Sequence, residues 1–191
     1  MNKGKIIVIA APSGCGKSTI INALLEGGDL NLGFAVSATT RAPRQGEKDG
    51  VNYYFMTEEA FRDAIADGEF LEYEEVYPGR FYGTLRSEID RIIGEGRNII
   101  LDLDVNGALR VKQEYGPQAL AVFIAPPSID ELRHRLELRG TESPEVIDTR
   151  VDRAEYEISR APEFDRQIVN DDLATAIRQT RNLIDAFASL Q

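Results

Sequence analysis

The segment KIIVIAAPSGCGKST, residues 5–19, is the part of the sequence that says most about the fold. Its first half is a continuous apolar run, which is typical of a central parallel strand covered on both faces. Its second half is a glycine-rich turn, and a helical pattern follows from Lys17 to Leu25. A buried strand, such a turn and a helix in direct succession form the arrangement that a phosphate-binding loop, or P-loop, requires. The alternative is a glycine-rich turn with a surface lysine and no ligand.

The residues of this turn suit the phosphates of a nucleotide. Gly14 and Gly16 allow the backbone to point its N–H groups inward, where the helix N-terminus adds a positive partial charge. Lys17 is expected to reach the β- and γ-phosphates, and the Ser18 hydroxyl to ligate Mg²⁺. Ala11 replaces the first glycine of the usual pattern, but it ends the strand, where extended backbone tolerates alanine. We therefore expect the loop to be intact.

Length and charge narrow the possible partners. The 191 residues are enough for one substantial domain with a hydrophobic core, and the net charge is −10. Because such a field repels phosphate, we expect neither duplex nucleic acid nor an anionic membrane as a partner.

The single cysteine, Cys15, excludes an internal disulfide and fits a cytoplasmic location. The apolar run at residues 6–11 is shorter than the core of a signal peptide, and no segment approaches membrane-spanning length.

Strand and helix patterns alternate along the chain. The runs NIILDLD and ALAVFIA indicate buried strands at residues 98–104 and 119–125, and further strands are expected at residues 34–38, 51–56, 69–77 and 166–169. Helices are expected at residues 58–67, 85–94, 105–114, from the Ser128 cap to about Arg139, from Ser143-Pro144 onward, and at 173–190. This alternation predicts an α/β fold with a mostly parallel central sheet. The block from residue 35 to about 82 has short strands and many tyrosines, and we expect it to form an inserted lobe.

A second group of residues suits a phosphate monoester. Arg41 and Arg44 lie three apart around a proline, and Tyr53 and Tyr82 follow. Two guanidiniums and two phenols make a good monophosphate site, because arginine donates paired hydrogen bonds to phosphate oxygens. Basic loops are more often simply exposed and charged. From these residues alone both interpretations stay open.

At this point the sequence resembles the guanylate kinase family over nearly its whole length. The motifs that carry the resemblance are APSGCGKST, VSATTRAPRQGEKDGVNYYF, GEFLEY, YGT, ILDLDVNGA, FIAPPS, RLELRGTES and IVNDD, in that order. The family transfers the γ-phosphoryl group of MgATP to GMP and yields ADP and GDP. The resemblance implies a three-layer α/β/α fold of the P-loop NTPase type with an inserted GMP-binding lobe and a helical lid. The expected core is residues 1–34, 84–126 and 160–191, the lobe about 35–83 and the lid about 127–159.

The resemblance also implies a set of binding residues. The residues expected to bind ATP are Ala11, Pro12, Ser13, Gly14, Cys15, Gly16, Lys17, Ser18, Thr19 and Asn170. The residues expected to bind GMP are Arg41, Arg44, Tyr53 and Tyr82 at its phosphate, with Ser37, Glu72, Gly83, Thr84 and Asp102 completing the site. Mg²⁺ would be held by Ser18 and, through water, by Asp102, with Asp104 as the second choice. Asn170 is expected beside the adenine.

Glu72 has a chemical rationale of its own. The Watson–Crick edge of guanine shows two adjacent donors, which a carboxylate accepts in parallel, whereas adenine presents a lone pair there. Sites that satisfy buried polar groups discriminate by about 10⁴-fold. The alternative is that EFLEYEEVY is an acidic, exposed edge strand, and without the family pattern we would favour it. Simple alternation places Glu72 on the same face as Phe70, Glu74 and Val76.

The transfer needs no general base. The nucleophile is a phosphate oxygen of GMP whose second pKa is about 6, so it is mostly deprotonated near neutral pH. Catalysis then reduces to alignment and charge neutralisation. The residues expected to supply the charge are Lys17, Arg41, Arg135, Arg139 and Arg150. An ordinary i,i+4 pairing of Glu131 with Arg135 is the alternative for the lid, and the only histidine, His134, is expected to be solvated.

Two other functions stay open. Guanylate-kinase-like domains of scaffold proteins keep the fold, lose catalysis and bind protein partners, but they typically have a degraded loop, whereas Gly16, Lys17 and Ser18 are all present here. A P-loop kinase for another small acceptor is the second possibility. The expected partners are the small molecules ATP and GMP, and the sequence gives no indication of oligomeric state.

Overall fold

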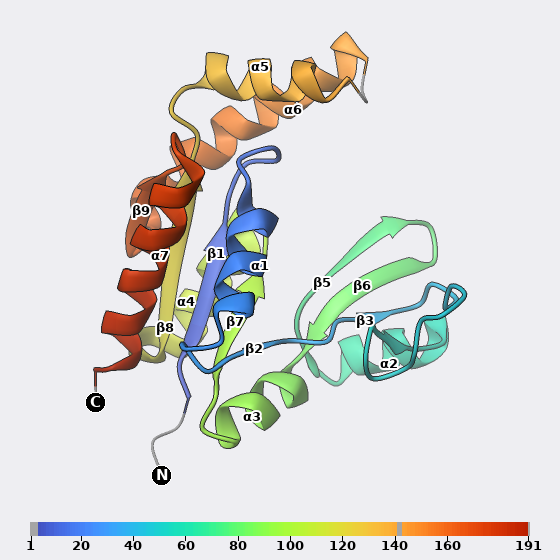
Figure 1. Ribbon diagram of the computed structural model, residues 1–191. Coiled ribbons are helices and arrows are strands. Elements are labelled where there is room, and N and C mark those ends of the chain that lie inside the picture. Colours follow the sequence, from blue (N-terminus) through green and yellow to red (C-terminus); the bar gives the residue numbers. More distant parts are fainter. Residues whose placement is uncertain (1–3, 141–142, 191) are drawn as a thin grey trace. The chain divides into compact units, whose positions relative to one another are not determined.

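The computed structural model describes residues 4–140 and 143–190, apart from the side chains of Val76 and Arg139 (Figure 1). The chain divides into two compact units. One contains residues 5–32 and 100–191 and is called the loop unit here, because it carries the glycine-rich turn. The other contains residues 1–4 and 33–99 and is called the hairpin unit. No helix of the described residues is long and apolar enough to cross a membrane.

The loop unit is built on the apolar runs of the sequence. β1 (Ile6–Ala10) is buried at every position and pairs in parallel with β8 (Ala119–Ala125), which pairs in parallel with β9 (Arg166–Val169). The full strand order is β2-β7-β1-β8-β9. β2 (Leu32–Phe34) and β7 (Asn98–Asp102) are the strands at which the chain passes from one unit to the other. Strands buried on both faces form because nearly every side chain in them is apolar.

Helices cover both faces of this sheet (Figure 1). Ile7 and Ile9 of β1 share a buried cluster with α1 (Lys17–Gly27) and α7 (Leu173–Ala188). α4 (Val105–Tyr115) packs on β1 and β8 from the other face. Alternate residues of a strand point to opposite faces, so one apolar strand serves both layers. The predicted α/β fold with a mostly parallel central sheet is confirmed.

Two further helices begin where the sequence predicts. The Ser128 hydroxyl accepts a hydrogen bond from the Glu131 N–H at 3.0 Å and caps α5 (Ile129–Arg139). α6 (Pro144–Ser159) starts at the proline, and it lies beside α5 in Figure 1. Leu132 and Val151, one from each helix, belong to the same buried cluster as β1. Two short 3₁₀ turns, η1 (Gly116–Gln118) and η2 (Ala161–Glu163), precede β8 and β9.

The hairpin unit contains a four-stranded sheet in the order β4-β3-β6-β5. Its strands are β3 (Ala38–Thr39), β4 (Tyr54–Phe55), β5 (Phe70–Tyr77) and β6 (Arg80–Leu85), and its helices are α2 (Glu58–Ala66) and α3 (Arg86–Gly94). Phe61 of α2 stacks on Phe70 and Phe81 with ring centroids 4.2 and 5.2 Å apart. These rings form the centre of a small core that holds α2 on the sheet.

Two strand predictions in this unit are wrong in extent, and one strand of the structure was not predicted. The strand expected at residues 34–38 is split, because the Val36 N–H donates to the buried Glu88 carboxylate at 3.3 Å instead of to a neighbouring strand. The strand expected at residues 51–56 shrinks to β4, because the backbone at residues 50–52 is used in turn hydrogen bonds. β6 was not predicted, since Gly83 interrupts its apolar alternation; a Cβ there would lie 2.7 Å from the Glu72 carbonyl oxygen.

Candidate functional site

The glycine-rich turn has the backbone that a phosphate-binding loop needs. Gly14 and Gly16 have φ values of 95° and 78°, which side chains with a Cβ rarely adopt. The turn is closed by a hydrogen bond from the Cys15 N–H to the Pro12 carbonyl at 3.1 Å, and α1 begins directly after it. Ala11 is not among the residues with positive φ. Alanine in place of the first glycine therefore adds no strain, as expected.

Asn170 is hydrogen-bonded to this turn. Its side-chain amide donates to the Cys15 carbonyl at 2.8 Å, and its own N–H donates to Ala125 at the end of β8 at 2.8 Å. A Cβ on Gly16 would lie 2.6 Å from the same amide nitrogen, so only glycine fits there. Arg135 in turn donates to the Asn170 carbonyl at 2.9 Å. Asn170 thus ties the carboxyl ends of two strands to the loop, and its expected place beside adenine stays a prediction.

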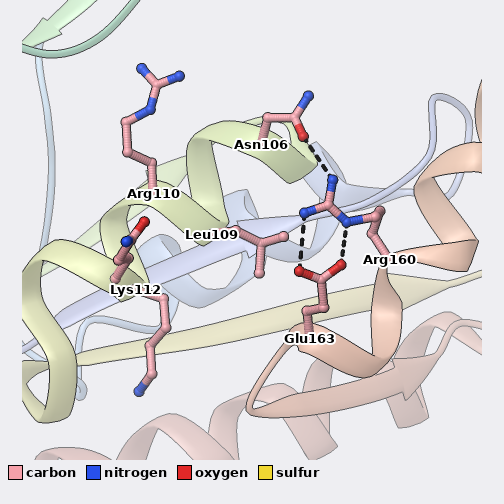
Figure 2. A pocket seen from close by; sticks show the side chains of 7 residues that line it. Asn106, Leu109, Arg110, Lys112, Arg160 and Glu163 are labelled. Atoms are coloured by element: carbon pink, nitrogen blue, oxygen red, sulfur yellow. Dashed lines mark hydrogen bonds and ion pairs between the residues drawn. The ribbon is translucent and has the colours of Figure 1, made fainter.

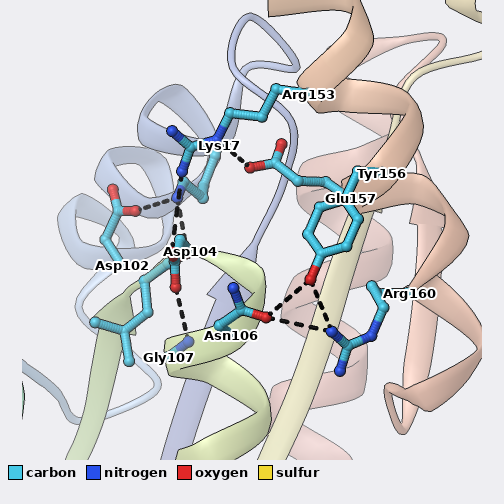
Figure 3. A network of polar contacts seen from close by, with 10 residues as sticks. Lys17, Asp102, Asp104, Asn106, Gly107, Arg153, Tyr156, Glu157 and Arg160 are labelled. Atoms are coloured by element: carbon cyan, nitrogen blue, oxygen red, sulfur yellow. Dashed lines mark hydrogen bonds and ion pairs between the residues drawn. The ribbon is translucent and has the colours of Figure 1, made fainter.

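Lys17, the first residue of α1, is already neutralised within the loop unit (Figure 3). Its Nζ lies 2.5 Å from Oδ1 of Asp102, which ends β7, and donates to the Leu103 carbonyl at 3.0 Å. The strand ends and the helix N-terminus meet here because parallel strands place their carboxyl ends at one edge of a sheet. A phosphate that binds Lys17 has to compete with Asp102 for it.

Asp104 has a different role from Asp102. Its Oδ1 accepts from the Gly107 N–H at 2.7 Å and caps α4 (Figure 3). Its other oxygen lies 4.0 Å from Arg153, and Arg153 also donates to Glu157 at 3.2 Å. Of the two carboxylates considered for the metal, Asp102 is therefore the one not used to cap a helix.

The glycine-rich turn and the residues that follow β7 line a cavity of about 620 Å³. It is lined by every residue from Ala11 to Thr19, by residues 102–104, and by Arg150, Arg153 and Glu157 of α6. Arg150 donates to the Ser13 hydroxyl at 2.8 Å, so its side chain lies at the loop, and its role at the γ-phosphate stays a prediction. Arg135 contacts Asn170 and also forms the i,i+4 pair with Glu131 at 2.9 Å that was the alternative for it. Arg139 ends α5, and its side chain lies outside the described residues.

Sequence reasoning missed Arg153 and Glu157. Arg150, Arg153 and Glu157 follow one another at spacings of three and four, which places them on one face of α6, and this pattern is the signal that would have found them. Glu157 is 7% exposed. Burial raises the pKa of its carboxyl, although Arg153 and Lys17 oppose that rise.

Neither the cysteine nor the histidine offers acid–base chemistry at the cavity. Burial raises the pKa of the Cys15 thiol to about 12, so the thiol stays protonated at neutral pH. His134 is exposed on α5, as predicted. Among the described residues, no group of three or more His, Cys, Asp or Glu side chains is arranged to hold a metal ion.

In the hairpin unit, the two tyrosines expected at the phosphate lie close to Arg41. Its guanidinium lies 5.3 Å from the ring centre of Tyr53, and the rings of Tyr53 and Tyr82 meet edge to face at 6.0 Å. Arg44 is exposed, and among the described residues its guanidinium has no hydrogen-bond or ion-pair partner. The site also contains a residue that sequence reasoning missed, Glu47, which accepts the paired hydrogen bonds of Arg41 at 2.9 Å each.

The residues expected around guanine lie along one row of the hairpin sheet. Glu72 pairs with Thr84 across β5 and β6, and the Thr84 hydroxyl donates to Glu72 Oε1 at 2.7 Å. Ser37 immediately precedes β3, and the register of Ala38 with Gly83 continued by one residue sets Ser37 opposite Thr84. Directly opposed residues point to the same face of a sheet. The three side chains therefore share a face.

The prediction that Glu72 shares a face with Phe70 is wrong, whereas Glu74, which pairs with Tyr82, does lie on the face of Glu72. The Val76 side chain, placed on that face by the same prediction, lies outside the described residues. The register shifts between Phe70 and Glu72, so Phe70 pairs with Leu85 and Glu72 with the neighbouring Thr84. Adjacent residues of β6 point to opposite faces, so Phe70 turns into the core while Glu72 turns away from it. This irregularity is a β-bulge, which commonly re-aims a side chain next to a binding site. Glu72 is half-buried rather than fully exposed.

A second cavity of about 430 Å³ lies against α4 and η2 (Figure 2). Arg160 there donates to Glu163 and to Asn106, and no residue that the sequence analysis singled out lines the cavity. In Figure 2 the Arg110 and Lys112 side chains point in different directions and do not converge on a common point. The cavity is therefore not a candidate for the predicted chemistry.

The family model described as guanylate kinase matches residues 3–187. The chain belongs to the guanylate kinase family. A guanylate kinase of Bacteroides thetaiotaomicron is 54% identical over 184 residues, which cover 96% of this chain and 90% of that protein. A guanylate kinase of Porphyromonas gingivalis is 55% identical over 183 residues, which cover 96% of this chain and 97% of that protein.

One solved structure agrees with the family. The crystal structure of guanylate kinase from Anaplasma phagocytophilum superimposes with a TM-score of 0.73 at 33% identity, over 100% of this chain and 89% of that one. The guanylate kinase fold is therefore shared over the whole chain. The intact turn at Gly14–Ser18 is present in this family member.

Proposed function

We propose that the protein transfers the γ-phosphoryl group of ATP to GMP and releases ADP and GDP. The observation that carries the proposal is the unstrained phosphate-binding turn, with Lys17 lining a cavity of about 620 Å³, in a member of the guanylate kinase family. A domain that had kept the fold only to bind a protein partner would have no need of this turn. The turn therefore favours an enzyme over a binding module.

On the ATP side, backbone N–H groups of the turn and the N-terminus of α1 would hold the phosphates. Lys17 would exchange the carboxylate of Asp102 for the β- and γ-phosphates, because an ammonium on a flexible stem can move from one anion to another. Arg150, at the Ser13 hydroxyl, would contribute a second positive charge. The proposed ATP site consists of residues 11–19 with Asn170, and Arg135 and Arg139 complete the proposed charge neutralisation.

The residues present fit Mg²⁺ bound together with ATP. Ser18 and Asp102 both line the loop cavity, and Mg²⁺ is usually held by one or two protein groups together with substrate phosphates rather than by a protein cage. Ser18 would bind the ion directly and Asp102 through water. When bound, the ion neutralises charge on the β- and γ-oxygens.

On the acceptor side, Arg41, Arg44, Tyr53 and Tyr82 would bind the phosphate of GMP. The free guanidinium of Arg44 supports this role, as does the cluster of rings at Arg41. Glu72 would accept the two donors of the guanine edge, with Ser37 and Thr84 on the same face. Gly83 and Asp102 complete the proposed GMP site.

The chemistry follows from positioning. GMP brings its own ionised oxygen, so neither the protonated Cys15 thiol nor the exposed His134 is needed. The chain has to align this oxygen with the γ-phosphorus and to neutralise the negative charge that spreads over the transferring group. The neutralising cations would be Lys17 and Arg150 at the loop, Arg135 and Arg139 of α5, and Arg41 at the acceptor.

An acceptor panel tests the proposal. Production of ADP from ATP would be followed with GMP, dGMP, AMP and UMP as acceptors. We expect rapid turnover with GMP, and about 10⁴-fold lower kcat/KM with AMP and UMP, because neither matches the Glu72 carboxylate. Equal turnover with UMP would favour a kinase for another acceptor, and no turnover with any of them would favour a binding module.

A cytoplasmic location remains part of the proposal and rests on the single, unpaired Cys15.

A further inference from the structure

The loop that carries the two proposed phosphate-binding arginines closes on one carboxylate. Glu47 Oε1 accepts from Arg41 Nη2, and Oε2 accepts from Arg41 Nη1, both at 2.9 Å. Oε2 also accepts from the backbone N–H of Arg44 at 2.6 Å. One side chain thus fixes the guanidinium of the first arginine and the main chain of the second.

The hydrogen bonds from Arg41 to Glu47 and Ala42 use only some of the N–H donors of its guanidinium. A guanidinium has five N–H donors. Both hydrogens of Nη1 are used, one by Glu47 and one by the Ala42 carbonyl at 2.7 Å, and one hydrogen of Nη2 is used by Glu47. Glu47 and Ala42 do not use the Nε–H and the second Nη2 hydrogen, which lie parallel along the side edge of the group. This edge is the second pair of donors with which arginine binds carboxylate or phosphate. Arg41 also hydrogen-bonds the Tyr82 side chain, which is itself expected at the phosphate of GMP.

The surroundings hold the guanidinium in this orientation. The Arg41 side chain is 9% exposed and that of Glu47 is 18% exposed. The rings of Tyr53 and Phe55 lie 5.3 and 5.8 Å from the guanidinium carbon, and Tyr82 interacts with the same group. Hydrogen bonds from Arg41 and from the Arg44 N–H keep the pKa of Glu47 below its ordinary value. The carboxylate is therefore ionised at neutral pH.

We propose that Glu47 is a positioning residue for the acceptor phosphate: it occupies the end of the Arg41 fork and presents the side edge to GMP. The inference rests on the proposed function, since it assigns GMP to this site. Glu47 stays in place when the phosphate binds, because the two anions use different edges of one guanidinium. Its hydrogen bond to the Arg44 backbone also holds the second arginine's segment in place.

The opposite role predicts an effect of the opposite sign. If Glu47 were instead a resident anion that the phosphate must displace, its removal would strengthen GMP binding. Removing a negative charge near a phosphate acts in the same direction. If GMP binds more weakly after Glu47 is removed, the lost orientation of Arg41 must outweigh the benefit of removing a negative charge near the phosphate. A purely electrostatic role of Glu47 does not produce weaker binding.

The experiment measures the binding of GMP and of guanosine by calorimetry in the full-length protein. For both Glu47→Gln and Glu47→Ala, we expect the Kd of GMP to rise about tenfold or more, because arginine's charge-assisted bonds to phosphate lose their alignment. The Kd of guanosine, which lacks the phosphate, should stay unchanged in the same variants. Glu59→Gln removes an equal charge from an exposed position of α2 and is the matched control.

The outcomes separate this inference from the proposed function. If the native protein binds neither GMP nor guanosine, the proposed function is wrong. If it binds both, and either Glu47 variant binds GMP as tightly as the native protein or more tightly, the positioning role is wrong. A parallel loss of GMP and guanosine binding in both variants would mean that Glu47 only stabilises the fold of this unit, and it would also overturn the inference.

Discussion

Two of the cations proposed to bind phosphate are already paired with carboxylates, one in each unit, and the pairs are built differently. In the loop unit, Lys17 makes a single ion pair with Asp102, and the two side chains are 20% and 29% exposed. In the hairpin unit, Arg41 and Glu47 share two parallel hydrogen bonds and are more deeply buried. The first pair is open to exchange, whereas the second is fixed in orientation.

The difference follows from the two head groups. An ammonium is a compact point charge on a flexible stem, so it can leave one anion for another. A planar guanidinium has two parallel donor pairs and can hold two anions at once. We therefore expect loss of the carboxylate to strengthen phosphate binding at Lys17 and to weaken it at Arg41. The predictions that follow test each side of this contrast.

The largest effect is expected at the loop. Lys17→Ala should lower kcat by about 10²- to 10³-fold or more, because the transferring phosphoryl group loses a preorganised cation. GMP binding should persist, since the proposed acceptor phosphate residues lie in the hairpin unit. Steady-state kinetics with circular dichroism measures both activity and fold. Arg110→Ala, which removes an exposed cation from the same unit, is the control. Near-native turnover in the Lys17 variant would mean that the loop takes no part in the reaction.

The next effect concerns selectivity for guanine. Glu72→Gln should lower kcat/KM for GMP by about 10²-fold, because one of two accepted hydrogen bonds becomes a clash between donors. ATP binding should be unaffected. Glu74→Gln, an exposed neighbour on the same strand, should behave like the native protein. An unchanged preference for GMP over AMP in the Glu72 variant would show that guanine is read elsewhere.

A smaller effect on nucleotide binding is expected for Asp102→Asn, and its sign should be opposite to that expected for the Glu47 variants. In the absence of Mg²⁺, Asp102→Asn should bind ATP about two- to fivefold more tightly, since a partly exposed ion pair no longer competes for Lys17. Calorimetry in a chelator measures this directly. Asp185→Asn on α7 serves as the charge control. Weaker nucleotide binding in the Asp102 variant would mean that the carboxylate positions Lys17, and the contrast between the two pairs would be lost.

The smallest effects are on stability and its dependence on pH. Glu88 in the hairpin unit is 3% exposed; burial raises the pKa of its carboxyl, but bonds from Arg91, the Val36 N–H and Tyr54 outweigh burial and lower it overall. The stability that Glu88 contributes is present above its unfolded pKa of about 4.3 and is lost as pH falls through the lower folded value. Glu88→Gln should therefore cost about 1–3 kcal/mol at neutral pH, and this cost should shrink on acidification.

Glu157 in the loop unit should behave in the opposite way. Its pKa is raised by burial, so the stability it contributes is present below its unfolded pKa and is lost as pH rises through the folded value. Glu157→Gln should accordingly be better tolerated at neutral pH than at pH 4. Thermal unfolding of both variants between pH 4 and about 8, compared with the native protein, measures this. Parallel pH profiles for the two variants would contradict the opposite shifts.

The loop unit could largely be predicted from sequence. The apolar runs at β1, β7 and β8 form strands because they are buried on both faces, and the turn forms because Gly14 and Gly16 must adopt positive φ. Both requirements are local and are visible in neighbouring residues. The hairpin unit was less predictable, because its short strands depend on contacts with distant residues, such as the bond from the Val36 N–H to Glu88.

The amino-acid sequence was sufficient to predict the family, the parallel sheet, the phosphate-binding turn and the residue types at both proposed sites, because these depend on local apolar patterns and backbone requirements. The pairing of each carboxylate with its cation and the direction of the Glu72 side chain became evident only in the folded chain. Lys17 and Asp102 are far apart in the chain, and a single bulge in β5 reverses the face of Glu72. Such contacts arise from packing and register, in which one extra residue moves every later side chain to the other face.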